Sequence, residues 1–173
     1  MRGRIAPLLA CIVAVAVGGM LLAGCGGAED GESRPAPAAS EFPAAKGRSL
    51  AEIAQVPEAK LVVAPAGAVV DVGVNRVAFG VFTLGGEQVD DADIALYFAS
   101  GPNAPAQGPF PAKVESLKTP AAFRAKTTSQ DPSSATSVYV VPRLKVQKRG
   151  ELAMLALVRR DGKLEGTRPP SLV

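Results

Sequence analysis

The stretch ELAMLALVRRDGKLEGT, residues 151–167, decides the fold class. In an extended chain, the apolar residues of this stretch would fall on two opposite faces. Leu152, Met154, Ala156 and Val158 would lie on one face, and Ala153, Leu155 and Leu157 on the other. Such alternation is typical of a β-strand. Asp161 and Gly162 then favour a two-residue hairpin turn of type I′, in which both central residues take positive φ. The stretch therefore predicts a β-hairpin near the C-terminal end of the chain.

Further β-prone runs precede this hairpin, separated by Gly, Pro and Asn. They are KLVVA (60–64), NRVAFGVFTL (75–84), DIALYFA (93–99), FPAKVESL (110–117) and SVYVVPRLKV (137–146). Pro142 cannot donate to a sheet, so it predicts a sheet edge or a bulge in the last run. We expect a loop over 119–137 that holds one short strand around Phe123. About seven short strands with almost no helix indicate an all-β, antiparallel β-sandwich over residues 60–170.

The N-terminal end has the three zones of a secretory signal peptide over residues 1–24: a basic start, a charge-free apolar run over 5–22 and small residues before a cysteine. The residues LAGC, 22–25, resemble the lipobox of bacterial lipoproteins, in which the cysteine is acylated and becomes the new N-terminus. We therefore expect Cys25 to carry a lipid that anchors the protein at the outer face of the cell membrane. The alternative is an uncleaved transmembrane anchor over 5–23.

Two short segments lie between the predicted lipid and the sandwich. Residues 25–47 are rich in Gly, Pro, Ala and Ser without a hydrophobic period, which predicts a flexible linker, a disordered stalk. Residues 48–59 carry Ser49 and Glu52 in the spacing of a capping box, and Pro57 follows them. This pattern predicts a short helix or turn segment.

The residue types present restrict the chemistry. The chain has no histidine, and Cys25 is the only cysteine after the predicted signal peptide. Histidine-dependent catalytic triads and Cys/His zinc sites therefore have no residues to form them. Ser116 and Lys118 are the only candidate catalytic pair, and strand alternation alone would also produce their spacing. We expect no enzyme activity, no cofactor site and no metal site.

One acidic cluster has residue types that could bind a hard cation. Glu87, Asp90, Asp91 and Asp93 lie within the stretch EQVDDAD, and carboxylate oxygens are the ligands that calcium prefers. Their spacing does not match an EF-hand loop. The alternatives are a small-ligand or calcium-binding carrier and an ordinary acidic loop between strands.

The charges are unevenly distributed. Residues 25–93 contain 5 basic and 11 acidic side chains, whereas residues 94–173 contain 12 basic and 5 acidic ones. A basic half suits anionic lipid or an acidic partner, and the alternative is an ordinary solvated surface. Basic pairs at 148–149 and 159–160 flank one predicted strand, so we expect two separate contacts at opposite ends of the sandwich. Nucleic acid is not an expected partner, because aromatic residues do not alternate with the basic ones.

Phe110 lies between two prolines in the stretch GPFPAKVES. An aromatic side chain on a Pro-punctuated edge segment could anchor a partner protein. The alternative is a phenylalanine that plugs one end of the sandwich.

Several of these stretches together resemble the N-terminal immunoglobulin-like domain of a group of high-GC Gram-positive lipoproteins. The likeness spans residues 62–170 and is carried by NRVAFGVFTLGGEQVDDADIALYFA, GPFPAKVESL, FRAKTTSQDPSSATSVYV and LALVRRDGKLEGTRP. Longer members of that group continue into a thioredoxin-like domain, but no CxxC motif follows here, so redox activity is not implied. A looser resemblance to copper-handling sandwiches lacks the histidine and methionine ligands.

The resemblance implies an immunoglobulin-like fold, a lipid anchor and an accessory role. We therefore expect a non-catalytic binding or adaptor module for another envelope protein, of thioredoxin-like or cytochrome-assembly type.

Overall fold

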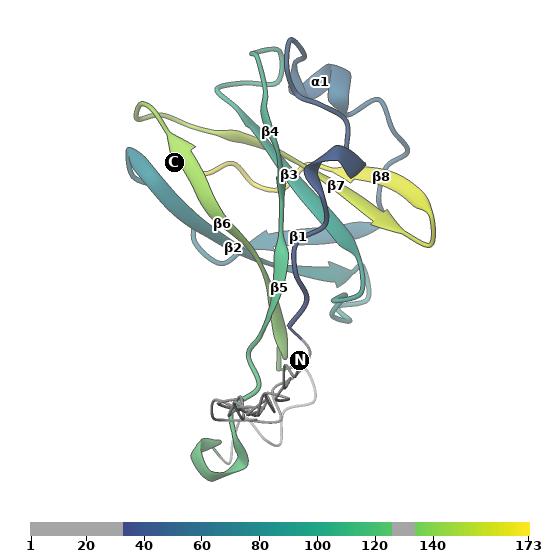
Figure 1. Ribbon diagram of the computed structural model, residues 1–173, viewed down its shortest axis with the longest axis vertical. Helices are drawn as coiled ribbons and strands as arrows, with labels where there is room; N and C mark the ends of the chain where they lie inside the picture. Colours follow the sequence, from purple (N-terminus) through teal and green to yellow (C-terminus); the bar gives the residue numbers. More distant parts are fainter. Residues whose placement is uncertain (1–32, 126–133) are drawn as a thin grey trace, which may run out of the picture.

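Two antiparallel four-stranded sheets pack face to face in the computed structural model, which describes residues 33–125 and 134–173 (Figure 1). In sheet I the order is β1 (Leu61–Pro65), β2 (Gly73–Thr83), β6 (Ser137–Val146), β5 (Lys113–Ser116). In sheet II it is β4 (Gln107–Pro111), β3 (Asp93–Ala99), β7 (Ala153–Arg160), β8 (Lys163–Thr167). This arrangement confirms the predicted all-β sandwich. The predicted signal peptide and Cys25 lie outside the described residues.

The main core lies between the two sheets. Every second residue of β3 and β7 contributes to it, including Ile94, Leu96 and Phe98 on β3 as the sequence predicts. The other sheet contributes Phe79 of β2 and Tyr139 of β6, whose rings stack with centroids 5.5 Å apart. Since these side chains are almost fully buried, the hydrophobic effect acting between the sheets is the main force that holds the sandwich together.

A second apolar cluster lies on the opposite, outer face of sheet II. The remaining side chains of β3 and β7 point to this outer face. The N-terminal segment covers them with Phe42, Ala45, Leu50 and Ile53. The cluster also includes Ala95, Tyr97, Ala99, Leu155 and Leu157. The prediction of a flexible linker over 25–47 is therefore wrong from residue 33 onward, because its isolated apolar residues pack on a sheet face that would otherwise be exposed.

Short helical turns shape this N-terminal segment, which we define as residues 33–59. A 3₁₀ turn spans Ala39–Glu41, and α1 spans Leu50–Ile53. Ser49 caps α1: its Oγ accepts from the Glu52 backbone N–H, while the Glu52 carboxylate accepts from the Ser49 backbone N–H. The predicted capping box and short helix are confirmed. No helix within residues 33–125 and 134–173 is long and apolar enough to cross a membrane.

The N-terminal segment also covers three of the four sheet edges. Arg34 exchanges two backbone hydrogen bonds with Val114 of β5, at 3.0 and 2.9 Å. Residues 48–49 lie along the chain that enters β4, and the carbonyl of Arg48 accepts from the N–H of Ala106. Residues 57–59 pair in parallel with β8 around Gly166. Strand β1 is the exception: within the described residues its backbone pairs only with β2.

Several local predictions can be compared with the strands. Asp161 and Gly162 have φ of 51° and 73°, as a type I′ turn requires, and the β2–β6 register shifts opposite Pro142 as predicted. The run 110–117 is not one strand: β4 ends in sheet II and β5 begins in sheet I. The short strand expected around Phe123 is wrong, because Ala121–Phe123 forms a 3₁₀ turn, η2.

Candidate functional site

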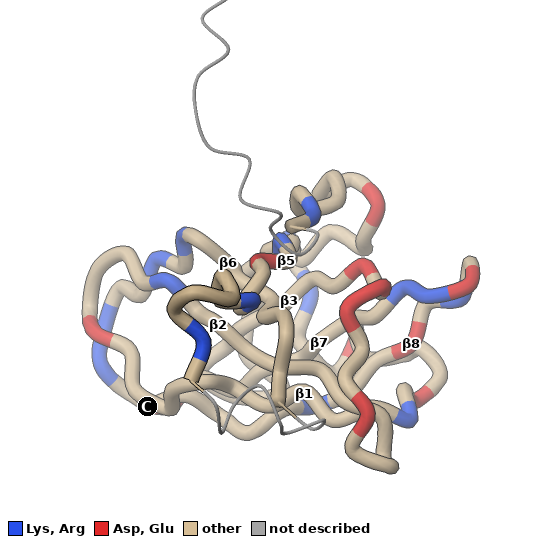
Figure 2. The backbone as a smooth tube through the Cα atoms, turned by 90° about the horizontal axis from the view of Figure 1, so that it is seen from below, with Lys and Arg blue, Asp and Glu red and all other residues tan. Residues whose placement is uncertain are grey.

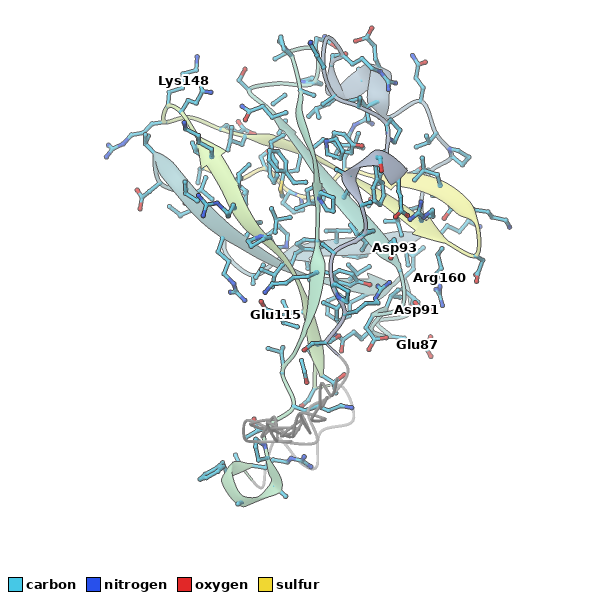
Figure 3. The ribbon with its side chains drawn as sticks, in the orientation of Figure 1. Glu87, Asp91, Asp93, Glu115, Lys148 and Arg160 are labelled. Carbon is cyan, nitrogen blue, oxygen red and sulfur yellow. The ribbon has the colours of Figure 1, made fainter. Side chains whose placement is uncertain are left out.

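The acidic stretch 87–93 lies between β2 and β3, and its side chains are tied to arginines. Asp93 Oδ1 accepts from Arg34 Nη1 at 2.7 Å, and Asp93 Oδ2 accepts from Arg159 Nη2 at 3.0 Å. Asp91 pairs with Arg160 at 3.3 Å. Figure 3 shows Asp91 and Arg160 beside each other, with Glu87 farther along the loop. Two of the four carboxylates considered as candidate calcium ligands are therefore neutralised by guanidinium groups.

A cation site needs several carboxylates that converge on one point. Within residues 33–125 and 134–173, no group of three or more acidic or cysteine side chains is placed to hold a metal ion. The arginine pairs have a different effect. They join the N-terminal segment to the sandwich, since Arg34 belongs to the former and Asp93 to the latter.

Arg159 is the centre of this junction. It pairs with Asp93 and with Glu41, and its guanidinium lies 5.3 Å from the centroid of the Phe42 ring. Hydrogen bonds to Asp93 and then Glu41 raise the pKa of Arg159 above its usual value. Sequence reasoning missed Glu41 and Phe42 because both lie in the stretch assigned to a flexible linker.

The two predicted basic pairs differ in availability. Lys148 and Arg149 are exposed in the β6–β7 loop, and Arg159 and Arg160 end β7 at the other end of the same strand, as predicted. Figure 3 shows Lys148 and Arg160 on opposite sides of the molecule. The second pair is bound to Glu41, Asp91 and Asp93, so it is not a free basic contact. Figure 2 shows mainly basic positions on the side near the C-terminus. Lys145, near the end of β6, is also exposed.

The candidate catalytic pair does not form the contact that catalysis would need. Ser116 Oγ accepts a hydrogen bond from the backbone N–H of Lys118 at 3.2 Å. A serine nucleophile requires the side-chain amine of the lysine as its base. The observed contact instead belongs to the local turn where β5 ends.

Phe110, the candidate anchor for a partner protein, is part of the sandwich instead. Its ring packs against the main core and lies 5.8 Å from the ring of Phe98 at an angle of 58°. The alternative reading, a plug at one end of the sandwich, is the one that the contacts favour.

An open cavity of about 280 Å³ lies where the N-terminal segment meets β7 and β8. Glu58 and Arg168 supply its charged groups. The volume is at the lower limit of small-ligand sites, which are lined mainly by apolar side chains with a few converging polar groups. Neither Glu58 nor Arg168 has an ion-pair partner among the described residues, and no other charged side chain lines the cavity.

The outer face of sheet I carries the most accessible apolar surface of any sheet. Val62 of β1 is 46 % exposed, and its neighbour across the strand pair is Phe82. The Phe82 ring lies close to Gly80, where a Cβ atom would be only 2.6 Å from Phe82 Cε2. On the far side of the same face, Glu115 pairs with Lys113 at 2.7 Å and with Arg76.

These two halves of the face differ in character. The apolar half, at β1, carries Val62 and Phe82, while the other half is covered by ion pairs that extend from Glu115 of β5 across β6 to Arg76 of β2. The Lys113 and Arg76 contacts hold the pKa of Glu115 below its usual value, with the Lys113 hydrogen bond as the largest cause. The apolar half adjoins β1, the strand whose other edge is unpaired in the described part of the chain.

In comparisons with protein-family models, with curated proteins and with solved structures, the chain matched none.

Proposed function

We propose that the chain is a membrane-anchored extracytoplasmic lipoprotein, modified at Cys25, that acts as a non-catalytic binding or adaptor module. The lipobox-like residues 22–25 support the anchor. The beginning of the folded part supports a short tether, because Ser33 follows Cys25 by only eight residues. An extended chain of that length reaches about 28 Å, so the domain stays close to the membrane surface.

The observation that carries the binding role is the uneven cover of the sheet edges. The N-terminal segment forms backbone hydrogen bonds to β5, to β8 and to Ala106 just before β4, whereas in the described residues it forms none to β1, beside the exposed Val62. An open edge strand can accept an extended peptide as an additional strand. We propose that a segment of another envelope protein pairs with β1 and places apolar side chains against Val62 and Phe82.

The strand order supports the finer fold assignment that we propose, an immunoglobulin-like sandwich. Constant-type immunoglobulin domains order their strands A-B-E-D in one sheet and C-F-G in the other. Taken in chain order with β4 as an additional edge strand, the orders β1-β2-β6-β5 and β3-β7-β8 agree with this pattern. The resemblance in sequence suggests a thioredoxin-like or cytochrome-assembly protein as the partner. A calcium carrier has less support, because Asp91 and Asp93 are bound to arginines.

The anchor is tested by expressing wild type and Cys25→Ser in a native-like host. The wild-type chain is expected in the detergent phase with an intact mass that includes a diacylglycerol. Cys25→Ser is expected to lose the lipid mass. A variant that is still processed and retained in the membrane would overturn the lipoprotein assignment.

The binding surface is tested by placing a photo-crosslinking amino acid at Val62 in the full chain. The matched control is the same amino acid at Lys163, which is exposed at the β7–β8 turn. We expect one defined crosslinked product from position 62 in native membranes and none from position 163. Val62→Lys in the same cells, with the crosslinker moved to position 64, should abolish the product. Equal products from positions 62 and 163 would contradict the proposal.

A further inference from the structure

The hairpin of β5 and β6 projects from the sandwich, and its tip has an unusual surface. Figure 1 shows this hairpin and η2 extending away from the two sheets. Phe123 at the end of η2 is 81 % exposed, the highest value among the exposed large apolar side chains. The other five phenylalanines of the chain are buried or partly buried, so Phe123 is the exception.

Two exposed basic residues lie near Phe123 in the sequence. Lys118 precedes η2 and Arg124 follows it directly, and both are exposed. The Arg124 guanidinium donates to the carbonyl of Thr119 at 3.1 and 3.3 Å, and the N–H of Phe123 donates to the carbonyl of Pro120 at 2.9 Å. These bonds close residues 119–124 into a turn that carries Phe123 and Arg124. No carboxylate among the described residues pairs with Lys118 or Arg124.

The hairpin lies at the end of the molecule where the chain enters the fold. Ser33 Oγ accepts from the N–H of Ser116, the last residue of β5, at 3.3 Å. Arg34 pairs with Val114 two residues earlier. The base of the hairpin is therefore within about 30 Å of the position where Cys25 would enter the bilayer, by the reach of an extended chain.

We propose that the hairpin tip, defined as Leu117, Lys118, Phe123 and Arg124, contacts the anionic phospholipid surface of the membrane to which the protein is anchored. This inference rests on the proposed membrane attachment. Aromatic rings favour the interfacial region of a bilayer, and lysine and arginine are attracted to anionic headgroups. Leu117, 51 % exposed, adds apolar surface at the base of the tip.

The contact would fix the orientation of the sandwich. Ser33 and the hairpin tip would form two attachment points at the same end of the molecule. The β6–β7 loop with Lys148 would then point away from the bilayer, because β6 runs from the hairpin to that loop over ten residues, about 33 Å. The acidic stretch 87–93 lies behind the tip at the hairpin base, where Gln88 binds the backbone of Ser137.

The absence of tryptophan from the chain allows a direct test. Phe123→Trp gives the full chain a single tryptophan, which is excited at a longer wavelength than the two tyrosines, and Val69→Trp gives the control, because Val69 is 76 % exposed in the β1–β2 loop beside the C-terminal residue. Each chain is reconstituted into phosphatidylcholine vesicles with or without phosphatidylglycerol. We expect Phe123→Trp to show blue-shifted emission and protection from acrylamide in the anionic vesicles, and Val69→Trp to show neither.

Charge reversal separates lipid contact from simple burial. In the Phe123→Trp chain, Lys118→Glu or Arg124→Glu should each lower the ratio of inserted to free tip about fivefold or more, the contribution of one cation near an anionic surface. The matched control is Lys148→Glu, which should leave this ratio unchanged. Equal acrylamide access at positions 123 and 69 would overturn the proposal, as would protection that survives both reversals at the tip.

The readout is independent of how the chain is attached. Whether Cys25 is acylated is decided by mass, and the vesicle measurement is made on chains that are already bound to the vesicles. A chain without a lipid at Cys25 would therefore contradict the proposed function and leave the fluorescence result interpretable.

Discussion

The outer face of sheet II is covered by another part of the chain, whereas the outer face of sheet I is exposed. On sheet II, the side chains of Tyr97, Leu155 and Leu157 are at most 1 % exposed because the N-terminal segment lies over them. On sheet I, Val62 is 46 % exposed, and the described residues place no segment over it. The first face is a second hydrophobic core, and the second is a surface. The difference shows that the N-terminal segment contributes to stability while it leaves one face open for contacts.

The largest predicted effect comes from truncating the cover of sheet II. Ile53→Ala removes a 1 % exposed side chain and leaves a cavity, so we expect a loss of about 3 kcal/mol in the free energy of unfolding. Val62→Ala removes a similar side chain from the open face and should change stability by less than about 0.5 kcal/mol. Urea unfolding of both variants measures the difference. Equal losses would mean that the two faces are not distinct.

The two tyrosines compare the two cores directly. Tyr139 donates to the carbonyl of Ala92 at 3.0 Å and accepts from its N–H at 3.2 Å inside the main core. Tyr97 makes one hydrogen bond, to the carbonyl of Pro43 in the N-terminal segment at 2.7 Å. Tyr139→Phe removes both hydrogen bonds and leaves the buried N–H of Ala92 unpaired, while the Ala92 carbonyl still accepts from Arg34, so the change should cost about 2 kcal/mol; Tyr97→Phe should cost about 1 kcal/mol. The reverse order in thermal unfolding would show that the hydrogen bond to the N-terminal segment is the more important one.

A smaller effect tests the junction of the N-terminal segment with β8. A Cβ atom at Gly166 would lie 2.9 Å from Val56 Cγ2 and 3.2 Å from Leu157 Cδ2. We expect Gly166→Ala to destabilise the protein by about 1 kcal/mol through overpacking. Val56→Ala in the same chain should recover part of that loss, which a double-mutant cycle measures. Gly67→Ala is the control, since its Cβ would meet no atom within 4 Å.

The last predicted effect is a loss of stability at high pH, which does not occur at neutral pH. Burial raises the pKa of Tyr97 and of Tyr139 to about 12, from an ordinary value of 10. A raised pKa means that the folded state favours the neutral phenol. Its stabilising contribution is therefore complete below pH 10 and is lost as the pH rises through about 12. We expect unfolding and tyrosinate absorbance to rise together in this window. Ionisation of either tyrosine near pH 10 with the fold intact would contradict the described burial.

Most of the strands follow from alternation, while the N-terminal cover does not. Strands β3 and β6 have the predicted bounds because their apolar runs end at turn residues. Residues 33–47 have no period, since a segment that crosses a sheet face needs only single anchors such as Phe42 and Ala45. A signal for this cover was nevertheless present. Ala95, Tyr97 and Ala99 carry no charge, so β3 has no hydrophilic face along these positions, and such a strand needs a partner on each face.

The candidate surfaces were harder to predict. EQVDDAD has the residue types of a cation site, but its charges are paired with Arg34, Arg159 and Arg160, which lie far away in the sequence. Pairing of this kind depends on the tertiary fold. The open edge of β1 is equally invisible in the sequence, because it is defined by which edges the N-terminal segment covers.

The pairing of residues 57–59 with Gly166 also sets the order in which the chain can fold. The N-terminal segment is synthesised first, yet its backbone partners on β8 follow about a hundred residues later, and contacts of such separation make folding slow. Until β8 has emerged, the outer face of sheet II has neither its last strand nor its complete cover. The cover of sheet II can therefore be completed only after β8 has been synthesised.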